Sequence, residues 1–345
     1  MAIRRGDTLI FAKPPVVAAW AAVGGKKESE GPLAQNFDLL VQDAGFAEED
    51  CDNWEQAESL LQQKCIRLCL RKGGVGDNCP DIAFAGDLQA QCTASNYTMR
   101  GLDIPYAGVY GACSTMAESL GLAACFAGSA LAGQALAFTS SHFCAAERQF
   151  RTPLDYGGKR TPTAQWTATA AGACLVRAPG NHGVAVLSVT FGRVRDFEIR
   201  DINNMGAAMM PAAAETLLRY FKATGTHPED FDAILTGDLG QVGSALLQEQ
   251  MRAEGLPLPN HQDCGCLLYD IPAQNVQAGG SGAGCSAAVL CASVLPKLQQ
   301  GAWRRVLLLS TGALMSQTTF LQGESIPGIA HAVELGGAQP TGGTA

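Results

Sequence analysis

The chain has 345 residues, of which 47% are hydrophobic and only 16% charged, so it can bury one large core or two fused smaller ones and is not a disordered protein. Its formal net charge of -8 argues against a nucleic-acid partner, because phosphate contacts need clustered cations. Thirteen cysteines are scattered through apolar stretches without a series of CxxC pairs. This pattern predicts reduced core thiols in a cytosolic protein, no metal site and no cofactor.

The first predicted strand, at residues 8–11, precedes an apolar run at residues 16–23. That run follows Arg4 and Arg5 and so imitates a signal peptide, but Lys13 and two prolines interrupt the apolar region. No stretch reaches the roughly 18 apolar residues that would span a bilayer. We therefore expect a cytoplasmic protein without a signal peptide or transmembrane helix, which would be held at a membrane only through partners.

The first half of the chain then alternates predicted helices and strands. The elements expected are a helix at 54–71, a strand at 82–86, a short buried strand at 102–110, a helix at 116–133 and a strand at 135–139. From residue 143 to residue 165, prolines and glycines mix with charged residues. This composition predicts a long irregular excursion of the kind that serves as a lid or a binding loop.

The second half repeats this alternation after a turn near residue 178. Strands are expected at 171–177, before this turn, and then at 184–191, 233–236, 274–278 and 306–310, with helices at 212–222, 244–254 and 286–299. The segment 336–345 is rich in Gly, Pro and Thr and is expected to be a disordered tail.

The clearest long-range pattern is an internal duplication. DIAFAGDLQAQCTA at residues 81–94 returns as DAILTGDLGQVGSA at residues 232–245. Each copy is followed by a glycine-rich turn that opens a helix, GACST at 111–115 and GAGCS at 282–286. A spacing of about half the chain predicts two similar α/β halves, at residues 1–178 and 179–335, related by a pseudo-twofold axis. A functional site is expected where the halves meet.

Cys113, in the first of these turns, is the strongest candidate for a functional residue. A thiol at the N-terminus of a helix lies near unpaired backbone N–H groups and the positive end of the helix dipole, which favour the thiolate. Its small neighbours would let a ligand approach. The alternative is a core cysteine at a tight turn.

Other candidates lie on the loops around this turn. His142 follows the strand after the Cys113 helix, and His331 follows the last repeated strand; each either lines a pocket or is a structural hydrogen-bonding residue. Arg148 and Arg151 belong to the one local cationic cluster of an acidic chain. They either grip a carboxylate or form a solvated face.

The duplicated Gly-Asp-Leu stretches place Asp87 and Asp238 at equivalent strand ends. At least one of them is expected to cap the following helix. The loop Gly279-Gly280-Ser281-Gly282 lacks the Lys-Ser/Thr ending of a P-loop, so it is expected to supply backbone donors and not a nucleotide site.

The duplication, with a cysteine at the first-half turn, resembles the thiolase and ketoacyl-synthase superfamily. Within it, GACSTMAESL, TSSHFCAAERQFRTPLDYGG, AGGSGAGCSA and ESIPGIAHAV are similar to the stage V sporulation protein AD family, and the resemblance spans residues 9–333. It implies a thiolase-like five-layer αβαβα fold built from two duplicated halves. It also implies a homodimer, for which we expect contact through the strand region 134–141.

The same resemblance implies non-catalytic binding of dipicolinic acid (pyridine-2,6-dicarboxylate), with or without calcium, for its uptake into the developing spore. The partners implied are other stage V sporulation membrane proteins, which would hold the chain at the spore inner membrane. The residues predicted to bind the ligand are Cys113, His142, Arg148, Arg151, Asp238, Ser281 and His331.

The departures from the enzymes of the superfamily concern catalysis. Condensing enzymes of the ketoacyl-synthase type pair their cysteine with a histidine in a His-Gln-Ala-Asn motif and an asparagine in a Gly-Asn-Thr motif. Here Asp238 and Ser281 stand near those places, which implies that the acyl-transfer set is lost. The alternative function is a cysteine-dependent acyltransferase or condensing enzyme that uses Cys113 with His142 or His331 as the base.

Overall fold

The first half of the chain builds a mixed five-stranded sheet. The computed structural model describes residues 2–49, 51–150 and 160–337. The strands are β3 (Val16–Gly24), β5 (Ile82–Gly86), β6 (Tyr106–Gly108), β7 (Gln134–Ser141) and β9 (Ala170–Arg177). They lie in the order β6-β5-β7-β9-β3, and β9 is antiparallel to both of its neighbours.

The second half repeats this sheet strand for strand. Its strands are β10 (Val184–Thr190), β11 (Ala233–Thr236), β12 (His261–Asp263), β14 (Arg305–Ala313) and β15 (Gly328–Gly336), in the order β12-β11-β14-β15-β10. In both halves the strands, numbered along the chain, therefore lie in the order 3-2-4-5-1, with the fifth antiparallel to its neighbours. Antiparallel pairing of β3 with β10 joins the two sheets. The predicted duplication is confirmed in the fold, because the two Gly-Asp-Leu stretches follow the equivalent strands β5 and β11.

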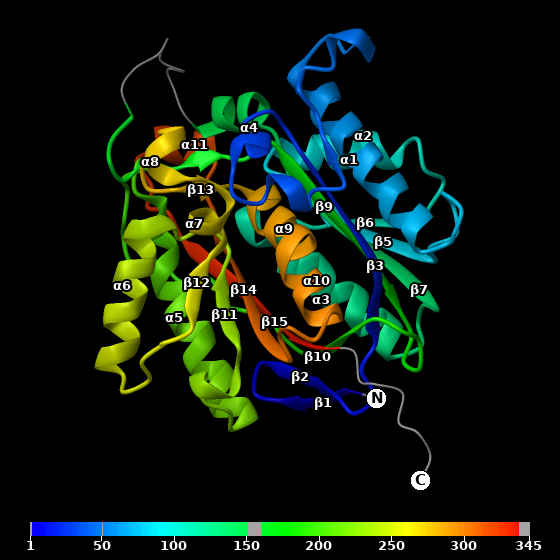
Figure 1. Ribbon diagram of the computed structural model, residues 1–345. Coiled ribbons are helices and arrows are strands. Elements are labelled where there is room, and N and C mark those ends of the chain that lie inside the picture. Colours follow the sequence, from blue (N-terminus) through cyan, green and yellow to red (C-terminus); the bar gives the residue numbers. More distant parts are fainter. Residues whose placement is uncertain (1, 50, 151–159, 338–345) are drawn as a thin grey trace.

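Helices complete five layers around the sheets. α1 (Trp54–Lys72) covers the outer face of the first sheet, and α5 (Met205–Thr224) with α6 (Gly240–Ala253) covers that of the second. Between the sheets lie α3 (Thr115–Gly128) and the continuous helical run α9 (Ala283–Val289), η7 (Leu290–Val294) and α10 (Leu295–Gln299), as Figure 1 shows. The thiolase-like αβαβα architecture predicted from the sequence is confirmed.

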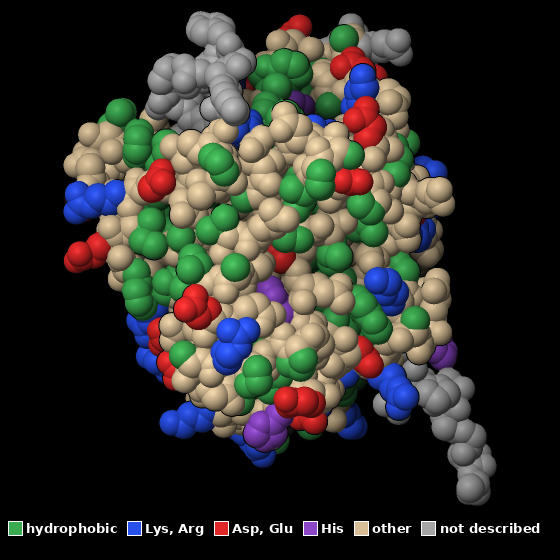
Figure 2. Space-filling view, turned by 60° about the vertical axis from the view of Figure 1, so that its left-hand side comes forward, with side chains coloured by type: hydrophobic (Ala, Val, Ile, Leu, Met, Phe, Trp, Pro, Cys, Tyr) green, Lys and Arg blue, Asp and Glu red, His purple; other side chains and the backbone are tan. Residues whose placement is uncertain are grey.

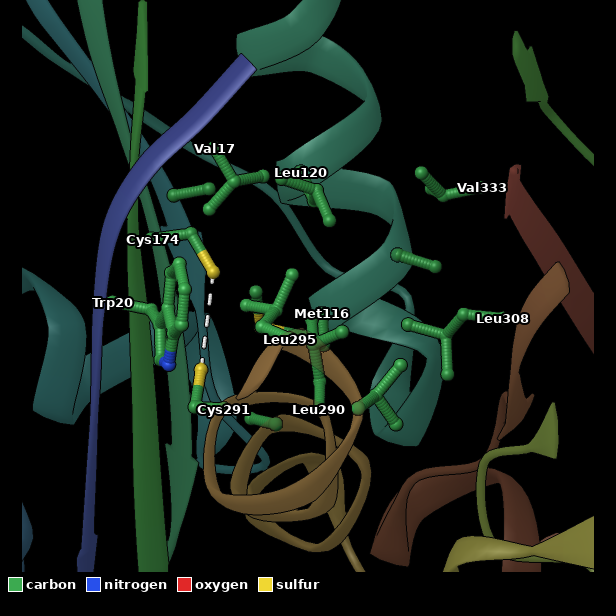
Figure 3. Close-up of a cluster of buried hydrophobic side chains, with 14 of the residues drawn as sticks. Val17, Trp20, Met116, Leu120, Cys174, Leu290, Cys291, Leu295, Leu308 and Val333 are labelled. Atoms are coloured by element: carbon green, nitrogen blue, oxygen red, sulfur yellow. Dashed lines mark hydrogen bonds between the residues drawn. The ribbon is translucent and has the colours of Figure 1, made fainter. Parts of the chain in front are cut away.

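The middle layer contains the largest cluster of buried apolar side chains (Figure 3). Met116 and Leu120 of α3 pack there with Leu290 and Leu295, and the Cys174 and Cys291 sulfur atoms lie 3.8 Å apart. Small residues allow the close approach: a Cβ on Gly172 of β9 would lie 2.6 Å from the Ala287 carbonyl oxygen. The many glycines and alanines of the sequence therefore permit helices to pack tightly on both sheets.

The remaining elements are short. They are β1 (Ala2–Arg5), β2 (Thr8–Phe11), β4 (Leu39–Leu40), α2 (Thr93–Met99), α4 (Phe143–Phe150), β8 (Trp166–Thr167), α7 (Cys264–Leu268), α8 (Ile271–Gln274), β13 (Gly280–Ser281) and α11 (Gln317–Leu321). The 3-10 turns are η1 (Glu28–Glu30), η2 (Ala34–Asn36), η3 (Ala47–Glu49), η4 (Ala90–Cys92), η5 (Ala112–Ser114) and η6 (Pro228–Asp230). On the face shown in Figure 2, acidic and basic side chains are interspersed. No helix in the described ranges is long and apolar enough to cross a membrane.

Several predicted elements differ from the observed ones. The excursion expected at 143–165 begins with α4 and ends near β8, which pairs with β13, so only part of it is irregular. The strand expected at 274–278 is absent, because α8 ends at Gln274 and a turn follows. The signal-like run at 16–23 is β3, a buried central strand. Most of the expected tail, residues 338–345, lies outside the described residues.

The expected dimer contact through residues 134–141 is wrong in its location. β7 has β5 on one edge and β9 on the other, and nearly all of its residues are buried. Both hydrogen-bonding edges of β7 are therefore occupied within the chain. A homodimer stays a prediction, without this interface.

Candidate functional site

A pocket of about 360 Å³ opens where the two halves meet, beside Cys113. It is lined by residues from both halves: Leu88, Ala90, Gln91, Tyr110, Ala112, Cys113, Gln149, Met205, Ser281, Ala313, Met315, Ser316, Gln317 and Thr318. We call this the Cys113 pocket. Its lining contains hydroxyl, phenol and amide groups among apolar side chains, and among the residues that the structure describes it includes no Lys, Arg, Asp or Glu.

Cys113 lies in η5, directly before α3, and is 7% exposed. The preceding residue, Ala112, has a φ of 51°, an uncommon conformation for a residue with a side chain. Ser114 Oγ donates to the Gly111 carbonyl at 2.6 Å, which holds the turn closed. The strained turn therefore presents the thiol at the wall of the pocket, as the sequence predicted.

Asp238 lies behind this wall and is fully buried. Its carboxylate accepts hydrogen bonds from Ser281 Oγ at 3.1 Å, from the Gly282 N–H at 2.9 Å and from Thr311 Oγ1 at 3.0 Å. Ser281, which holds this carboxylate, and Cys113 both line the pocket. The structure thus brings together three of the predicted site residues, Cys113, Asp238 and Ser281.

The electrostatics of this cluster oppose ionisation of the thiol. Burial, followed by the Asp238 carboxylate, raises the pKa of Cys113 well above its usual value. Burial also raises the pKa of Asp238 to about 6, against the hydrogen bonds that favour its charged form. The expectation that the helix N-terminus favours a thiolate is therefore wrong here, because desolvation and a neighbouring anion outweigh it.

The two duplicated aspartates have diverged in their contacts. Asp87 accepts from Ser95 N at 2.8 Å in the first turn of α2 and from Gln89 N at 2.9 Å, which confirms the capping role for that copy. In the second half the corresponding place is taken by Asp263, which accepts from the Leu239 and Gly240 N–H groups at the start of α6. Sequence reasoning missed Asp263. Its capping role leaves the Asp238 carboxylate to accept from Ser281, Gly282 and Thr311.

Neither predicted histidine lies in the lining of the Cys113 pocket. His142 is 2% exposed, its Nε2 lies 3.0 Å from the Ala44 carbonyl oxygen, and its ring stacks on Trp54. His331 Nδ1 accepts from the Gly192 N–H at 3.1 Å, and burial lowers its pKa to about 4. These contacts correspond to the structural alternative for each histidine.

Of the two predicted arginines, Arg148 is not brought to the pocket. Arg148, near the end of α4, forms an ion pair with Glu55 of α1 and lines a separate groove of about 710 Å³ beside α1 and α2. Arg151 lies outside the described residues. The polar lining residues that sequence reasoning missed are Gln91, Tyr110, Gln149, Ser316, Gln317 and Thr318. Two of them carried a signal, since Tyr110 directly precedes GACST and Gln91 lies in the first duplicated stretch.

The fold is thiolase-like, of the ketoacyl-synthase III type. Three solved structures share this fold over nearly their whole length. They are 3-oxoacyl-[acyl-carrier-protein] synthase III from Aquifex aeolicus VF5 (TM-score 0.56, 11% identity, 93% of this chain and 99% of that chain), cerulenin-bound OleA from Xanthomonas campestris (0.59, 15%, 97% and 99%) and the tetronic acid condensing enzyme AbyA1 (0.59, 17%, 94% and 100%). At such low identity the similarity shows the fold alone.

The sequence places the chain more narrowly. The family model of stage V sporulation protein AD matches residues 5–336. The Stage V sporulation protein AD of Bacillus subtilis (strain 168) is 40% identical over 331 residues, which cover 95% of this chain and 96% of that protein. The chain belongs to the stage V sporulation protein AD family, and this membership supports a role in sporulation.

Proposed function

We propose that this chain binds dipicolinic acid in the Cys113 pocket and is not an enzyme. In this proposal it serves uptake of the acid into the developing spore, as a homodimer and together with stage V sporulation membrane proteins that hold it at the spore inner membrane. The observation that carries the proposal is the buried Asp238 carboxylate, which accepts from the pocket residue Ser281 and, after burial, raises the pKa of the Cys113 thiol. This charge opposes the thiolate that acyl transfer needs.

The pocket matches a small planar diacid in its volume and in its hydrogen-bond donors. Its volume of about 360 Å³ lies at the small end of the range for ligand pockets, roughly 300–1,000 Å³. Tyr110, Gln91 and Gln149 can donate to carboxylate oxygens from the walls, and the N-terminus of α3 adds partial positive charge beside Cys113. Because the described part of the lining has no cation, we place the ligand contacts on these neutral donors and not on His142 or Arg148.

The acyltransferase alternative is favoured by the fold of the solved condensing enzymes and by the position of Cys113 before a helix. The neighbours of the thiol argue against it. The negative charge of the buried Asp238 carboxylate, together with burial of the thiol, disfavours a thiolate at Cys113. Intact-mass spectrometry after incubation with acetyl-CoA distinguishes the two, because an acyltransferase would gain one acyl group on Cys113.

Titration calorimetry with dipicolinate tests the proposed function. Ala90 is exposed on the rim of the pocket, so Ala90→Trp should fill the opening without disturbing the core. Leu131→Trp is the matched control, since Leu131 is 71% exposed and lies outside the lining. The proposal expects Ala90→Trp to lose at least about tenfold in affinity, about 1.4 kcal/mol, while Leu131→Trp binds as the parent does. Equal affinity of all three proteins would place the ligand elsewhere.

A further inference from the structure

A buried polar network lies behind one wall of the Cys113 pocket. The wall is the segment 88–91, in which Leu88, Ala90 and Gln91 line the pocket. Leu88 also packs in one apolar cluster with Ala112 and Cys113. Gln91 has a φ of 55°, so this wall is held in an uncommon backbone conformation. Such a conformation persists only where the surrounding contacts enforce it.

Asp87 and Gln89 alternate with the lining residues along this segment, and their side chains lie in the buried network. Gln89 is 1% exposed, and its Nε2 donates to Glu58 Oε2 of α1 at 2.7 Å. Asp87 accepts from the backbone of Gln89 and from both the N–H and the hydroxyl of Ser95. The wall is therefore fixed on its buried side by two carboxyl groups, one on α1 and one at the end of β5.

The network holds more acceptors than donors. Ser140 Oγ donates to Glu58 Oε1 at 2.7 Å, and Gln62 Nε2 donates to both Ser95 Oγ and Ser140 Oγ. Gln62 Oε1 and Gln89 Oε1 are buried and have no hydrogen-bond partner. A protonated carboxyl at Glu58 would supply one missing donor, because the Gln89 amide can turn its oxygen toward Glu58.

We propose that Glu58 positions the 88–91 wall of the Cys113 pocket through Gln89, and that a proton held by the Glu58–Asp87 pair keeps this wall in place. Glu58 is a positioning residue, since it does not line the pocket. The inference deepens the proposed function, because a fixed wall would preset the pocket for its ligand. The wall itself can be tested without any ligand.

The surrounding charges support a shared proton. Burial, followed by the Asp87 charge, raises the pKa of Glu58 to about 8. The other titratable groups on neighbouring elements are Cys92 before α2, Tyr106 on β6, and His142 directly after β7. Arg148 on α4 pairs with Glu55 on the outer side of α1. None of these places a cation against the carboxyl pair, so a proton is the natural neutralising charge.

The proton gives this wall a defined pH dependence. When the wall opens and Glu58 becomes hydrated, its pKa returns toward 4.5, whereas the closed wall holds the proton up to about pH 8. The closed form therefore binds more protons between these values, and its advantage declines as the pH rises. The decline is at most about tenfold in the opening equilibrium per pH unit.

Hydrogen exchange of the ligand-free protein between pH 6 and pH 8 tests this. Protection factors of the 88–92 amides, corrected for intrinsic rates, should fall with rising pH by up to about tenfold per unit. The Glu58→Gln variant should keep the protection and lose the pH dependence, since an amide can donate to Gln89 Oε1 at any pH. Amides of α6 provide the internal control. A flat profile in the parent, or an unchanged slope in Glu58→Gln, would overturn the inference.

Dipicolinate calorimetry at pH 7 supplies the second readout. Glu58→Ala, which removes the contact to Gln89, should weaken binding at least fivefold, and Glu58→Gln should bind within twofold of the parent. If Glu58→Ala also binds as the parent does, the wall does not preset the pocket and the inference fails. If no variant, including the parent, binds dipicolinate, the proposed function fails, while the exchange profile still decides the role of Glu58.

Discussion

The buried carboxylate of Asp238, in the second half of the molecule, raises the pKa of the thiol of Cys113, in the first half. Asp238 is held beside the Cys113 pocket by the lining residue Ser281. In a cysteine-dependent enzyme the partner of the thiol must accept or stabilise its proton as a base. A buried carboxylate that already accepts from Ser281, Gly282 and Thr311 instead keeps the thiol protonated.

The first prediction concerns thiol reactivity. Cys79 is an exposed free cysteine, whereas Cys113 is buried and has a raised pKa. Iodoacetamide at pH 7.5 should therefore label Cys79 within minutes and leave Cys113 unmodified over the same time, because the thiolate is the reactive species. Peptide mass spectrometry measures both sites in one sample. Labelling of Cys113 as fast as Cys79 would support the acyltransferase alternative.

The second prediction is that removing the Asp238 charge makes Cys113 more reactive. Asp238→Asn removes the negative charge beside the thiol, so the pKa of Cys113 should fall and its alkylation should become faster than in the parent. The variant should also lose about 1–3 kcal/mol in the free energy of unfolding, since an amide cannot accept all the bonds made to the carboxylate. Asp43→Asn, on an exposed turn, is the control. Unchanged labelling of Cys113 would show that burial alone suppresses it.

The third prediction concerns the pH dependence of stability. Burial raises the pKa of Glu118 to about 7, and its Oε2 has no hydrogen-bond partner. The folded state thus binds more protons than the unfolded state between about pH 4.5 and pH 7, and this contribution to stability is lost as the pH rises through that window. Between pH 5 and pH 7, the free energy of unfolding of Glu118→Gln should fall less than that of the parent. Denaturant titrations at several pH values measure it, and parallel curves for both proteins would contradict it.

The fourth prediction tests the close contact between the halves at the cysteine turn. A Cβ on Gly312 of β14 would lie 2.1 Å from the Gly111 carbonyl oxygen, so Gly312→Ala forces the turn away from the sheet. The expected loss in the free energy of unfolding is about 1–3 kcal/mol. Gly76→Ala, where the nearest atom is the Cys79 sulfur at 3.5 Å, should change stability little. Equal stability of both variants would mean that the turn can shift without cost.

Much of the fold was predictable from the repeat. Equivalent strands and turns in the two halves gave the duplicated architecture, because alternating apolar runs and glycine-rich turns depend on local sequence. Predictions failed where tertiary context decided the outcome. The apolar run at 16–23 is a central strand only because β9 and β10 pair with it, and α4 forms within a stretch whose prolines and glycines obscured it.

Less of the candidate site was predictable. Cys113 and Ser281 lie on glycine-rich turns at helix starts, so their positions followed from the motif. His142 and Arg148 follow the right strand, but the direction of a side chain after a strand end depends on its neighbours: Ala44 and Glu55 hold these two away from the pocket. Asp263, and not Asp238, caps the start of α6, and this depends on long-range contacts that no local sequence pattern predicts.

The most direct test of the central claim is a crystal structure of the protein soaked with dipicolinate at a concentration well above its dissociation constant. The proposal predicts ligand density in the Cys113 pocket, with carboxylate oxygens within hydrogen-bond distance of Tyr110 or Gln149 and no covalent bond to Cys113. Density for the ligand only outside this pocket, or an unoccupied pocket in crystals of a protein that binds dipicolinate in solution, would contradict it.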